Sequence, residues 1–512
     1  MLLSAVTVLL FVQLPPGSDV PPLDDKGVET AIKTGHLSLA REALERRLNA
    51  DPRDFRAHLL LGIVYEEQNE PKRAIEQFQK SKDIRPQDSS PRVNLGKALA
   101  RQGDLDGAFE EFTAAIQLDR KNAVAYSNRA TLQMSRKHWV EAEADLRVAL
   151  ALAPNDLDVA LPLFETQIAQ RSLSPARTTA ALIAKIGPAS AELFDHLGAV
   201  QAEAGDYVGA ISNLEKAYAL SPDSYDTGYN LSLAYLRAGN AVQAGRTLEM
   251  LRGKQEKAEV EDLLGEAYEK TNRPLDAVRA FQRAAKLEPG SGDYRFDYLY
   301  ELISHQSFEA ATLVGRPAVQ DFPASLKIQL AFGTAVYGKG NYEEAYGIFL
   351  KAARTFTDST LPLYYLGLSA EARGRQGDEI RELTEAYLKR HPKDFLALYL
   401  LGRDEAQRSN PGRAIELLNE SLRLREDHAA SHEEIAKAYA KTGSWQEAIR
   451  HYKRALVLQP DLAEAYYRLA HAYREVGDDE HATTNLTTYK RLHEQQAHRN
   501  PVSPFLYTLN AK

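Results

Sequence analysis

Residues Phe55–Asp88 read FRAHLLLGIVYEEQNEPKRAIEQFQKSKDIRPQD, and this stretch decides the fold. Apolar side chains recur at helical spacing twice, over 59–64 and over 74–78, with a polar turn between the two runs. Pro71 suits the first turn of a second helix. Pro86 ends that helix, because proline donates no backbone hydrogen bond and disfavours helix in the residue before it. The stretch therefore predicts two helices joined by a short turn.

The same pattern recurs along the chain with a period of 34 residues. Fourteen consecutive blocks run from residue 21 to residue 496, and twelve of them are 34 residues long. Position 20 of the block is alanine in thirteen of the fourteen, position 8 is glycine in seven, and position 32 is proline in eight. Small residues at positions 8 and 20 let two antiparallel helices cross closely. One pair has too little surface to bury its own apolar face, so we expect neighbouring pairs to stack into a shared core.

Three stretches carry the fullest form of the repeat: YNLSLAYLRAGN (Tyr229–Asn240), LLGEAYEKTNRPLDAVRAFQRAAKLEP (Leu263–Pro289) and EEIAKAYAKTGSWQEAIRHYKRALVLQP (Glu433–Pro460). They resemble the tetratricopeptide repeat (TPR) family, whose unit reads Trp/Tyr-x2-Leu-Gly-x2-Tyr…Ala-x3-Phe…Ala…Pro. The resemblance covers about residues 21–496 and is typical of bacterial multi-repeat arrays. It implies an all-α fold, a right-handed superhelical α-solenoid of about fourteen TPR-like helix-turn-helix repeats, which binds peptides or proteins on its concave face.

Two blocks depart from the pattern, and we interpret both as bends in the array. Pro162 falls in the middle of one expected first helix, while Gly315 and Pro317 weaken an expected second helix. Ordinary drift in a tolerant repeat explains these departures equally well. The resulting division of the chain is residues 1–20 (apolar N-terminal segment), 21–156 (units 1–4), 157–190 (degenerate unit), 191–291 (units 6–8), 292–325 (degenerate unit), 326–496 (units 10–14) and 497–512 (C-terminal tail).

The N-terminal segment predicts export. Leu2–Leu14 is an uncharged, largely apolar run that is short for a membrane helix and matches the core of a signal peptide. It lacks the basic residues and the cleavage motif of such peptides, and an apolar helix packed on the first repeat is the alternative. We therefore expect a periplasmic or secreted protein, with the cytoplasm as the alternative. No later segment is long and apolar enough to predict an integral membrane span.

Composition and motifs argue against several function classes. The 512 residues carry a net charge of −8, with 71 acidic against 63 basic residues, which disfavours a nucleic-acid partner. The absence of cysteine excludes disulfides and thiolate metal sites. The P-loop-like run 333–340 ends in Gly340 instead of Ser or Thr, and His428 and His432 lack an evident third ligand. We predict no enzyme activity, no cofactor, no metal site and no small-molecule substrate.

The family resemblance places positions 2, 5, 6, 9, 12 and 13 of each first helix on the concave face. Carboxylates gather there in the middle of the array and predict a partner with a basic segment, although a solvated acidic face is the alternative. Tyrosines supply rigid contact area, although packing between adjacent helices explains them too. Asparagines at position 6 commonly bind the backbone of an extended ligand in this family. The predicted groove residues are Asn94, Asn128, Asp195, Asp226, Tyr229, Asn230, Asp262, Glu266, Glu269, Phe296, Tyr300, Tyr337, Tyr364 and Tyr399, and Tyr365 also faces inward.

The sequence thus predicts a non-catalytic scaffold that binds a protein or peptide, with a role in assembly of an envelope or secretion complex. The alternatives are a regulatory or targeting subunit of an enzyme complex, as with glycosyltransferases, and a cytoplasmic peptide sensor. The tail 497–512 contains two prolines and shows no helical period. Its Phe505, Leu506 and Tyr507 either dock onto the end of the array or belong to a disordered tail.

Overall fold

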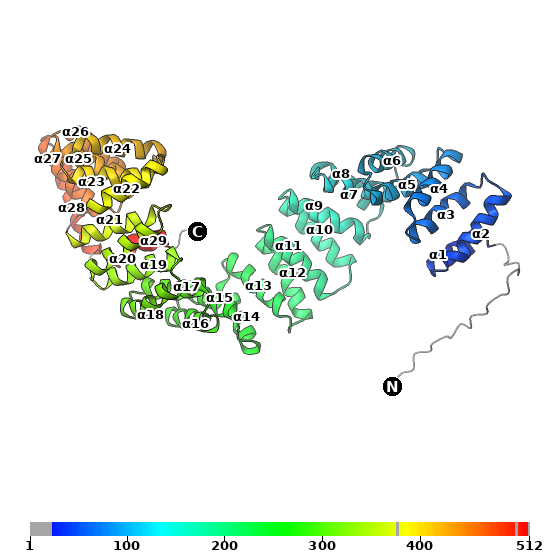
Figure 1. Cartoon of the computed structure of the whole chain (residues 1–512), viewed down its shortest axis with the longest axis horizontal. Helices are drawn as coiled ribbons and strands as arrows, with labels where there is room; N and C mark the ends of the chain where they lie inside the picture. The colour runs from blue at the N-terminus through cyan, green and yellow to red at the C-terminus, as the bar shows by residue number, and fades with distance from the viewer. Residues whose placement is uncertain (1–22, 375–377, 497–499, 510–512) are drawn as a thin grey trace. The chain divides into compact units, whose positions relative to one another are not determined.

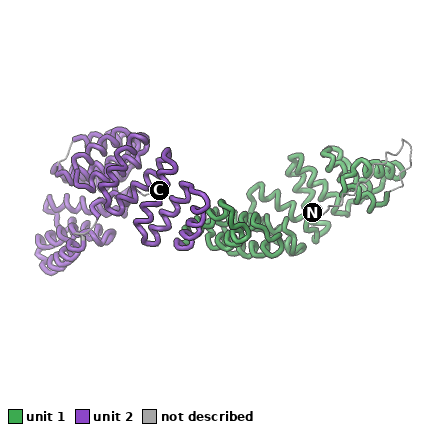
Figure 2. The backbone as a smooth tube through the Cα atoms, turned by 90° about the horizontal axis from the view of Figure 1, so that it is seen from below, with its two compact units in different colours: residues 1–238 green, residues 239–512 purple. Residues whose placement is uncertain are grey.

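The computed structural model describes residues 23–374, 378–496 and 500–509, which form 29 helices and no strand. The chain divides into two compact units, residues 1–238 and 239–512 (Figure 2). The all-α solenoid of helix pairs predicted from the sequence is confirmed.

The described residues of the first unit form the helices labelled in Figure 1 as α1 (Asp25–Lys33), α2 (Leu37–Ala50), α3 (Phe55–Glu67), α4 (Pro71–Ile84), α5 (Ser89–Gln102), α6 (Leu105–Leu118), α7 (Ala123–Ser135), α8 (Trp139–Leu152), α9 (Leu157–Ala169), α10 (Leu173–Ile186), α11 (Ala191–Glu203), α12 (Tyr207–Leu220) and α13 (Tyr225–Arg237). The described helices of the second unit are α14 (Ala241–Lys254), α15 (Ala258–Lys270), α16 (Pro274–Leu287), α17 (Gly292–Ser304), α18 (Phe308–Asp321), α19 (Leu326–Gly338), α20 (Tyr342–Thr355), α21 (Leu361–Arg373), α22 (Asp378–Arg390), α23 (Phe395–Gln407), α24 (Pro411–Leu424), α25 (Ala429–Lys441), α26 (Trp445–Leu458), α27 (Ala463–Glu475), α28 (Asp479–Gln496) and α29 (Ser503–Leu509).

Each repeat starts and turns by local rules that the sequence supplies. Many first helices begin after an Asp, Asn or Ser whose side chain caps the helix; Asp54, for example, accepts the Ala57 amide at 2.9 Å. Position 15 of all fourteen repeats has a positive φ, which reverses the chain between the two helices. Eight of these residues are glycine and six are other residues, among them Arg171 at +56°. A side chain in this left-handed conformation costs about 1–2 kcal/mol, so tertiary packing maintains the turn at those six positions.

The alanines of position 20 lie where the two helices of a pair cross. All thirteen are at most 1% exposed: Ala40, Ala74, Ala108, Ala142, Ala176, Ala210, Ala244, Ala277, Ala311, Ala345, Ala414, Ala448 and Ala482. Glycine at position 8 serves the same close approach. A Cβ on Gly333 would lie 2.4 Å from the Phe349 ring, so only glycine fits beneath that ring. The small residues that revealed the repeat are therefore the contact points of the core.

The two prolines that interrupt the pattern lie inside unbroken helices. α9 runs for 13 residues through Pro162, and α18 runs for 14 residues through Pro317. Gly315 in α18 has a packing role, because a Cβ there would lie 2.7 Å from the Phe332 side chain of the next repeat. The division of the array at 157–190 and 292–325 stays a prediction; the boundary between the compact units falls between Ala238 and Gly239.

No described helix is long and apolar enough to cross a membrane. The N-terminal run that predicts a signal peptide lies outside the described residues.

Candidate peptide-binding groove

The last helix of the chain, α29, returns to pack on the first helices of repeats 9 to 11. Figure 1 shows this short segment beside α19, and its side chains join a hydrophobic core to which the helices α17 to α22 contribute. The segment holds only seven residues, so it has too few hydrogen bonds to form a stable helix by itself. Its helical form therefore depends on the surface that it contacts. We call the surface that α17, α19 and α21 present to α29 the tail groove.

Phe505 is the anchor of the segment. Its side chain is 1% exposed, and its ring lies 4.7 Å from the Tyr337 ring, 4.9 Å from the Tyr365 ring and 5.8 Å from the Phe349 ring, centroid to centroid. Tyr365 meets it edge-on at 70°, and Phe349 lies nearly parallel at 17°. These separations suit edge-to-face and stacked aromatic contacts, which stabilise beyond the burial of area alone. An aromatic side chain thus fills an aromatic cage made by three rings of the array.

Polar contacts fix the direction and register of the segment. The buried Tyr365 hydroxyl donates to the Phe505 carbonyl oxygen at 2.8 Å and lies 2.8 Å from the Thr508 hydroxyl. Burial raises the pKa of the Tyr365 phenol, so it stays protonated and able to donate. The Asn500 amide donates to the Ser304 carbonyl at 3.3 Å, at the open C-terminal end of α17. One of these contacts is to the tail backbone, at Phe505, and the other two involve the side chains of Thr508 and Asn500; together they fix the position of the tail along the groove.

Two sequence-based expectations about the tail need correction. The described tail is helical over Ser503–Leu509, and it docks on the inner side of repeats 9 to 11, not at the end of the array. The apolar residues that pack on the core follow the spacing i, i+3, i+4, i+7: Val502, Phe505 and Leu509 are buried and Leu506 is partly buried, whereas Tyr507 is 82% exposed. Pro504 sits in the first turn of α29, where a missing backbone N–H costs little. This period spans only two turns and lies beside prolines, so it is too short to predict a helix from the sequence.

The predicted aromatic residues of the groove fall into two classes. Tyr300, Tyr337 and Tyr364 are partly buried and pack against the core that contains Phe505. Phe296 and Tyr399 are 5% and 6% exposed, so they contribute mainly to packing between helices. Burial raises the pKa of Tyr399 to about 12. In the first unit, Tyr229 of α13 is partly buried and stacks on Tyr225 with ring centroids 6.1 Å apart.

The predicted asparagines of α5 and α7 bond within their own helices. The Asn94 amide donates to the Ser90 carbonyl at 3.0 Å, and the Asn128 amide donates to the Val124 carbonyl at 2.7 Å. Asn230 lies partly buried on α13. Their role in binding the backbone of a ligand stays a prediction.

The predicted carboxylates are distributed over both units. In the first unit, Asp226 is exposed and Asp195 is partly buried. In the second unit they follow one face of α15: Asp262 is partly buried, Glu266 pairs with Lys270 at 3.1 Å, and Glu269 lies 2.7 Å from His305. The sequence did not single out His305 or its other neighbour, Glu301 of α17. A carboxylate at position 10 of the repeat, which is usually small or apolar, is the signal that could have found Glu301.

The fold and groove define a class of protein: an α-solenoid of helical repeats, here with its own C-terminal segment packed on the first helices of three pairs. Sequence models of the tetratricopeptide repeat match residues 28–89, 93–156, 201–267 and 380–429, and a TPR repeat model matches residues 436–477. The chain belongs to the tetratricopeptide repeat family as a multi-repeat protein, and it is a protein-interaction scaffold of that kind.

Several curated relatives share parts of the array. The chain is 25% identical over 188 residues to the type IV pilus assembly protein PilF of Pseudomonas aeruginosa, covering 34% of this chain and 75% of the relative. It is 28% identical over 125 residues to the mouse protein O-mannosyl-transferase TMTC1, covering 24% of this chain and only 13% of the transferase. It is 25% identical over 132 residues to the rat mitochondrial import receptor subunit TOM70, covering 26% and 22% of the two chains.

Solved structures with similar arrangements include Naa15/Naa10 bound to HypK-THB, with a TM-score of 0.46, 18% identity and coverage of 84% of this chain and 67% of the other. A structure of Pseudomonas aeruginosa pilF has a TM-score of 0.35, 24% identity and coverage of 40% and 92%.

Proposed function

We propose that this chain is a non-catalytic scaffold that binds a short helical segment of a partner protein in the tail groove. The segment carries apolar residues at the spacing i, i+3, i+4, i+7, and one of these residues is an aromatic anchor. The chain's own tail fills the same groove when the partner is absent. A helix that lays its apolar face into a groove is a recurrent mode of peptide recognition.

The observation that carries this proposal is the tail itself. Phe505 is fully enclosed by three aromatic rings, while Tyr507, on the opposite side of the same helix, is exposed. Tyr365 donates to a main-chain carbonyl, a group that every peptide offers. The groove therefore recognises an aromatic side chain and a backbone, and both can come from another chain.

A competition experiment tests the proposal with full-length protein. Phe505→Ala combined with Leu509→Ala frees the groove, and a fluorescent peptide of residues 500–512 is then titrated into the variant and into the parent. We expect the peptide to bind the variant at least tenfold more tightly than the parent, whose own tail competes. A matched peptide with Tyr507→Ala binds equally well, whereas one with Phe505→Ala does not. Failure of the unaltered peptide to bind the variant refutes the groove as a site for peptides in trans.

The partner itself is found by placing a photo-crosslinking residue at Tyr337, which contacts the Phe505 ring. A partner of the tail groove is captured by this variant, and an excess of the tail peptide prevents the capture. A protein that is captured equally well with and without the peptide does not use the groove.

We further propose that the scaffold is exported and assists the assembly of an envelope or secretion complex. The similarity to a type IV pilus assembly protein and the apolar run Leu2–Leu14 support this setting. Mass spectrometry of the mature N-terminus tests it: a cut near residues 15–25 is expected, and an intact Met1 contradicts export.

The carboxylates of α15 support a basic segment in the partner, because acidic side chains along one face attract cations. Reversing Asp262 and Glu266 to lysine should weaken binding of the captured partner and reduce its sensitivity to salt. Binding that is unchanged in this variant would mean that the two carboxylates form a solvated face only.

A further inference from the structure

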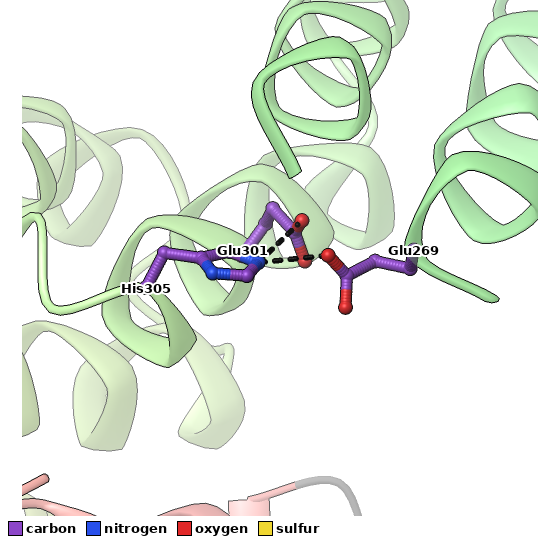
Figure 3. A group of neighbouring side chains, drawn as sticks. All are labelled: Glu269, Glu301 and His305. Carbon is purple, nitrogen blue, oxygen red and sulfur yellow. Dashed lines mark hydrogen bonds and ion pairs between the residues drawn. The ribbon is translucent and has the colours of Figure 1, made fainter. Parts of the chain in front are cut away.

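Glu269, Glu301 and His305 form a compact cluster between α15 and α17, apart from the aromatic cage of the tail groove. Glu269 lies in the last turn of α15, Glu301 lies in the last turn of α17, and His305 caps α17. The Nε2 atom of His305 is 2.7 Å from an Oε1 atom of Glu269 and 3.2 Å from Oε1 of Glu301 (Figure 3). One potential ligand atom from each residue lies within 4.8 Å of the others.

Glu301 is the unusual member of the cluster. Its side chain is only 4% exposed, and its Oε1 atom has no hydrogen-bond partner among the described residues, although it points at the other two side chains in Figure 3. The Nε2 atom of His305 lies closer to Glu269, and the hydrogen bond that it makes in the cluster is the one with Glu269. A buried carboxylate without a partner is costly, so the site needs a positive charge or a proton at this point.

Another repeat places a carboxylate at the same position and neutralises it with arginine. Asp404 is position 10 of its repeat, is 5% exposed and pairs with Arg408 at 2.8 Å. Within the described part of the chain, the ion-pair partner of Glu301 is His305 alone. The cluster thus lacks the permanent cation that the equivalent position receives elsewhere in the array.

The chemistry of the three groups suits a divalent metal ion. Two carboxylate oxygens and one imidazole nitrogen are ligands of Zn²⁺ and similar first-row ions, which bind them at about 2.0–2.2 Å. Tetrahedral ligands at such distances lie roughly 3.4 Å apart. The atoms of the cluster are already 2.7 and 3.2 Å apart, so small side-chain movements open the space. Glu269 and His305 are 38% and 36% exposed, which leaves the ion a path from solvent and a coordination position for water.

We propose that Glu269, Glu301 and His305 bind a divalent transition-metal ion of the Zn²⁺ type, which links α15 to α17. The ion takes one oxygen from each carboxylate and Nε2 of His305, whose remaining proton then lies on Nδ1. The site joins neighbouring repeats and is independent of the proposed function of the tail groove.

Titration of the full-length, metal-stripped chain with Zn²⁺ by calorimetry tests the proposal. Because the chain has 13 histidines, the comparison with variants is decisive. We expect one high-affinity site in the parent, at least tenfold weaker binding in Glu301→Gln and in His305→Gln, and a parent-like site in Asp293→Asn. Asp293 is the matched control, since it is an exposed carboxylate in the first turn of α17, at the opposite end of the helix from Glu301.

Two further measurements keep the result interpretable. Circular dichroism confirms that each variant is folded, and Co²⁺ added to the parent gives visible absorption bands that report its coordination. Loss of these bands in Glu301→Gln supports the site. Zn²⁺ affinity that is the same in the parent, Glu301→Gln and His305→Gln, or the absence of a high-affinity site in the parent, overturns the proposal.

Discussion

Replacing Phe505 by alanine should release the tail from its groove while the repeats stay folded. The reason is that the free energy gained by burying the segment is close to the free energy lost by ordering it. Burial of Val502, Phe505 and Leu509, together with part of Leu506, contributes about 5–10 kcal/mol. Ordering the backbone of the seven residues of α29 costs a similar amount, at about 1–2 kcal/mol per residue. The docked state is therefore favoured by a small margin, which the hydrogen bonds from Tyr365 and Asn500 supply.

The magnitude of the change follows from the burial of the ring. Phe505 is 1% exposed, and truncating such a phenylalanine to alanine costs about 3–5 kcal/mol. Each 1.4 kcal/mol is a factor of ten, so the equilibrium shifts by about a hundredfold to a few thousandfold. This shift exceeds the margin of the docked state, and the tail becomes mostly undocked.

Hydrogen–deuterium exchange measures this release directly. In the parent, the Leu506 amide donates to the Val502 carbonyl at 3.1 Å inside the docked helix, so peptides covering residues 500–509 exchange slowly. In Phe505→Ala they should exchange at the rate of an unstructured chain, while peptides from α14–α16 keep their protection. Tyr507→Ala is the control, because this side chain is 82% exposed on the same helix. Equal protection of the tail in the parent and in Phe505→Ala would refute the reasoning.

Three further predictions concern the repeats. Ala277→Leu should lower the free energy of unfolding by about 1–3 kcal/mol, because Ala277 is fully buried at a helix crossing; a parent-like thermal melt would show that the crossing has spare room. Arg171→Gly should raise the free energy of unfolding by about 0.5–1 kcal/mol. Glycine relieves the strain of the left-handed φ of +56°, at some cost in chain entropy. An unchanged free energy of unfolding in urea would count against strain at this turn. Glu301→Gln should remove a pH dependence of the free energy of unfolding. Between about pH 5 and 9 the folded parent retains a proton that the unfolded chain has lost, so the stability of the parent falls with rising pH. Urea unfolding in the presence of a chelator should therefore show a flatter pH profile for the variant. Parallel profiles for the parent and the variant would contradict that assignment.

The repeat architecture could be predicted because its rules are local and recur fourteen times. Alanine at position 20 and glycine at position 8 mark helix crossings that depend only on residues within one or two repeats. A single helix such as α9, with Pro162 inside it, is less predictable, because the packing of its neighbours decides whether it continues. The cap at Asp54 can be predicted from the sequence, because it depends on neighbouring residues. The left-handed conformation of Arg171 cannot, because tertiary packing maintains it.

The site was only partly predictable. Tyr337 and Tyr365 were placed on the inner face through the register of the repeat, and both contact Phe505 in the structure. That the occupant is the chain's own tail could not be read from the sequence, because Tyr365 and Phe505 are 140 residues apart along the chain. The same holds for Glu301, whose neighbours Glu269 and His305 come together only when α15 and α17 pack.

The sequence by itself determined the repeat and the helix pairs, because both depend on contacts within a short, recurring stretch of chain. The tertiary structure alone decided which inner surface is filled and which buried carboxylate lacks a cation. Both outcomes depend on contacts between segments that are not related by the 34-residue period. At such contacts, one aromatic ring or one missing arginine changes the balance of burial and charge.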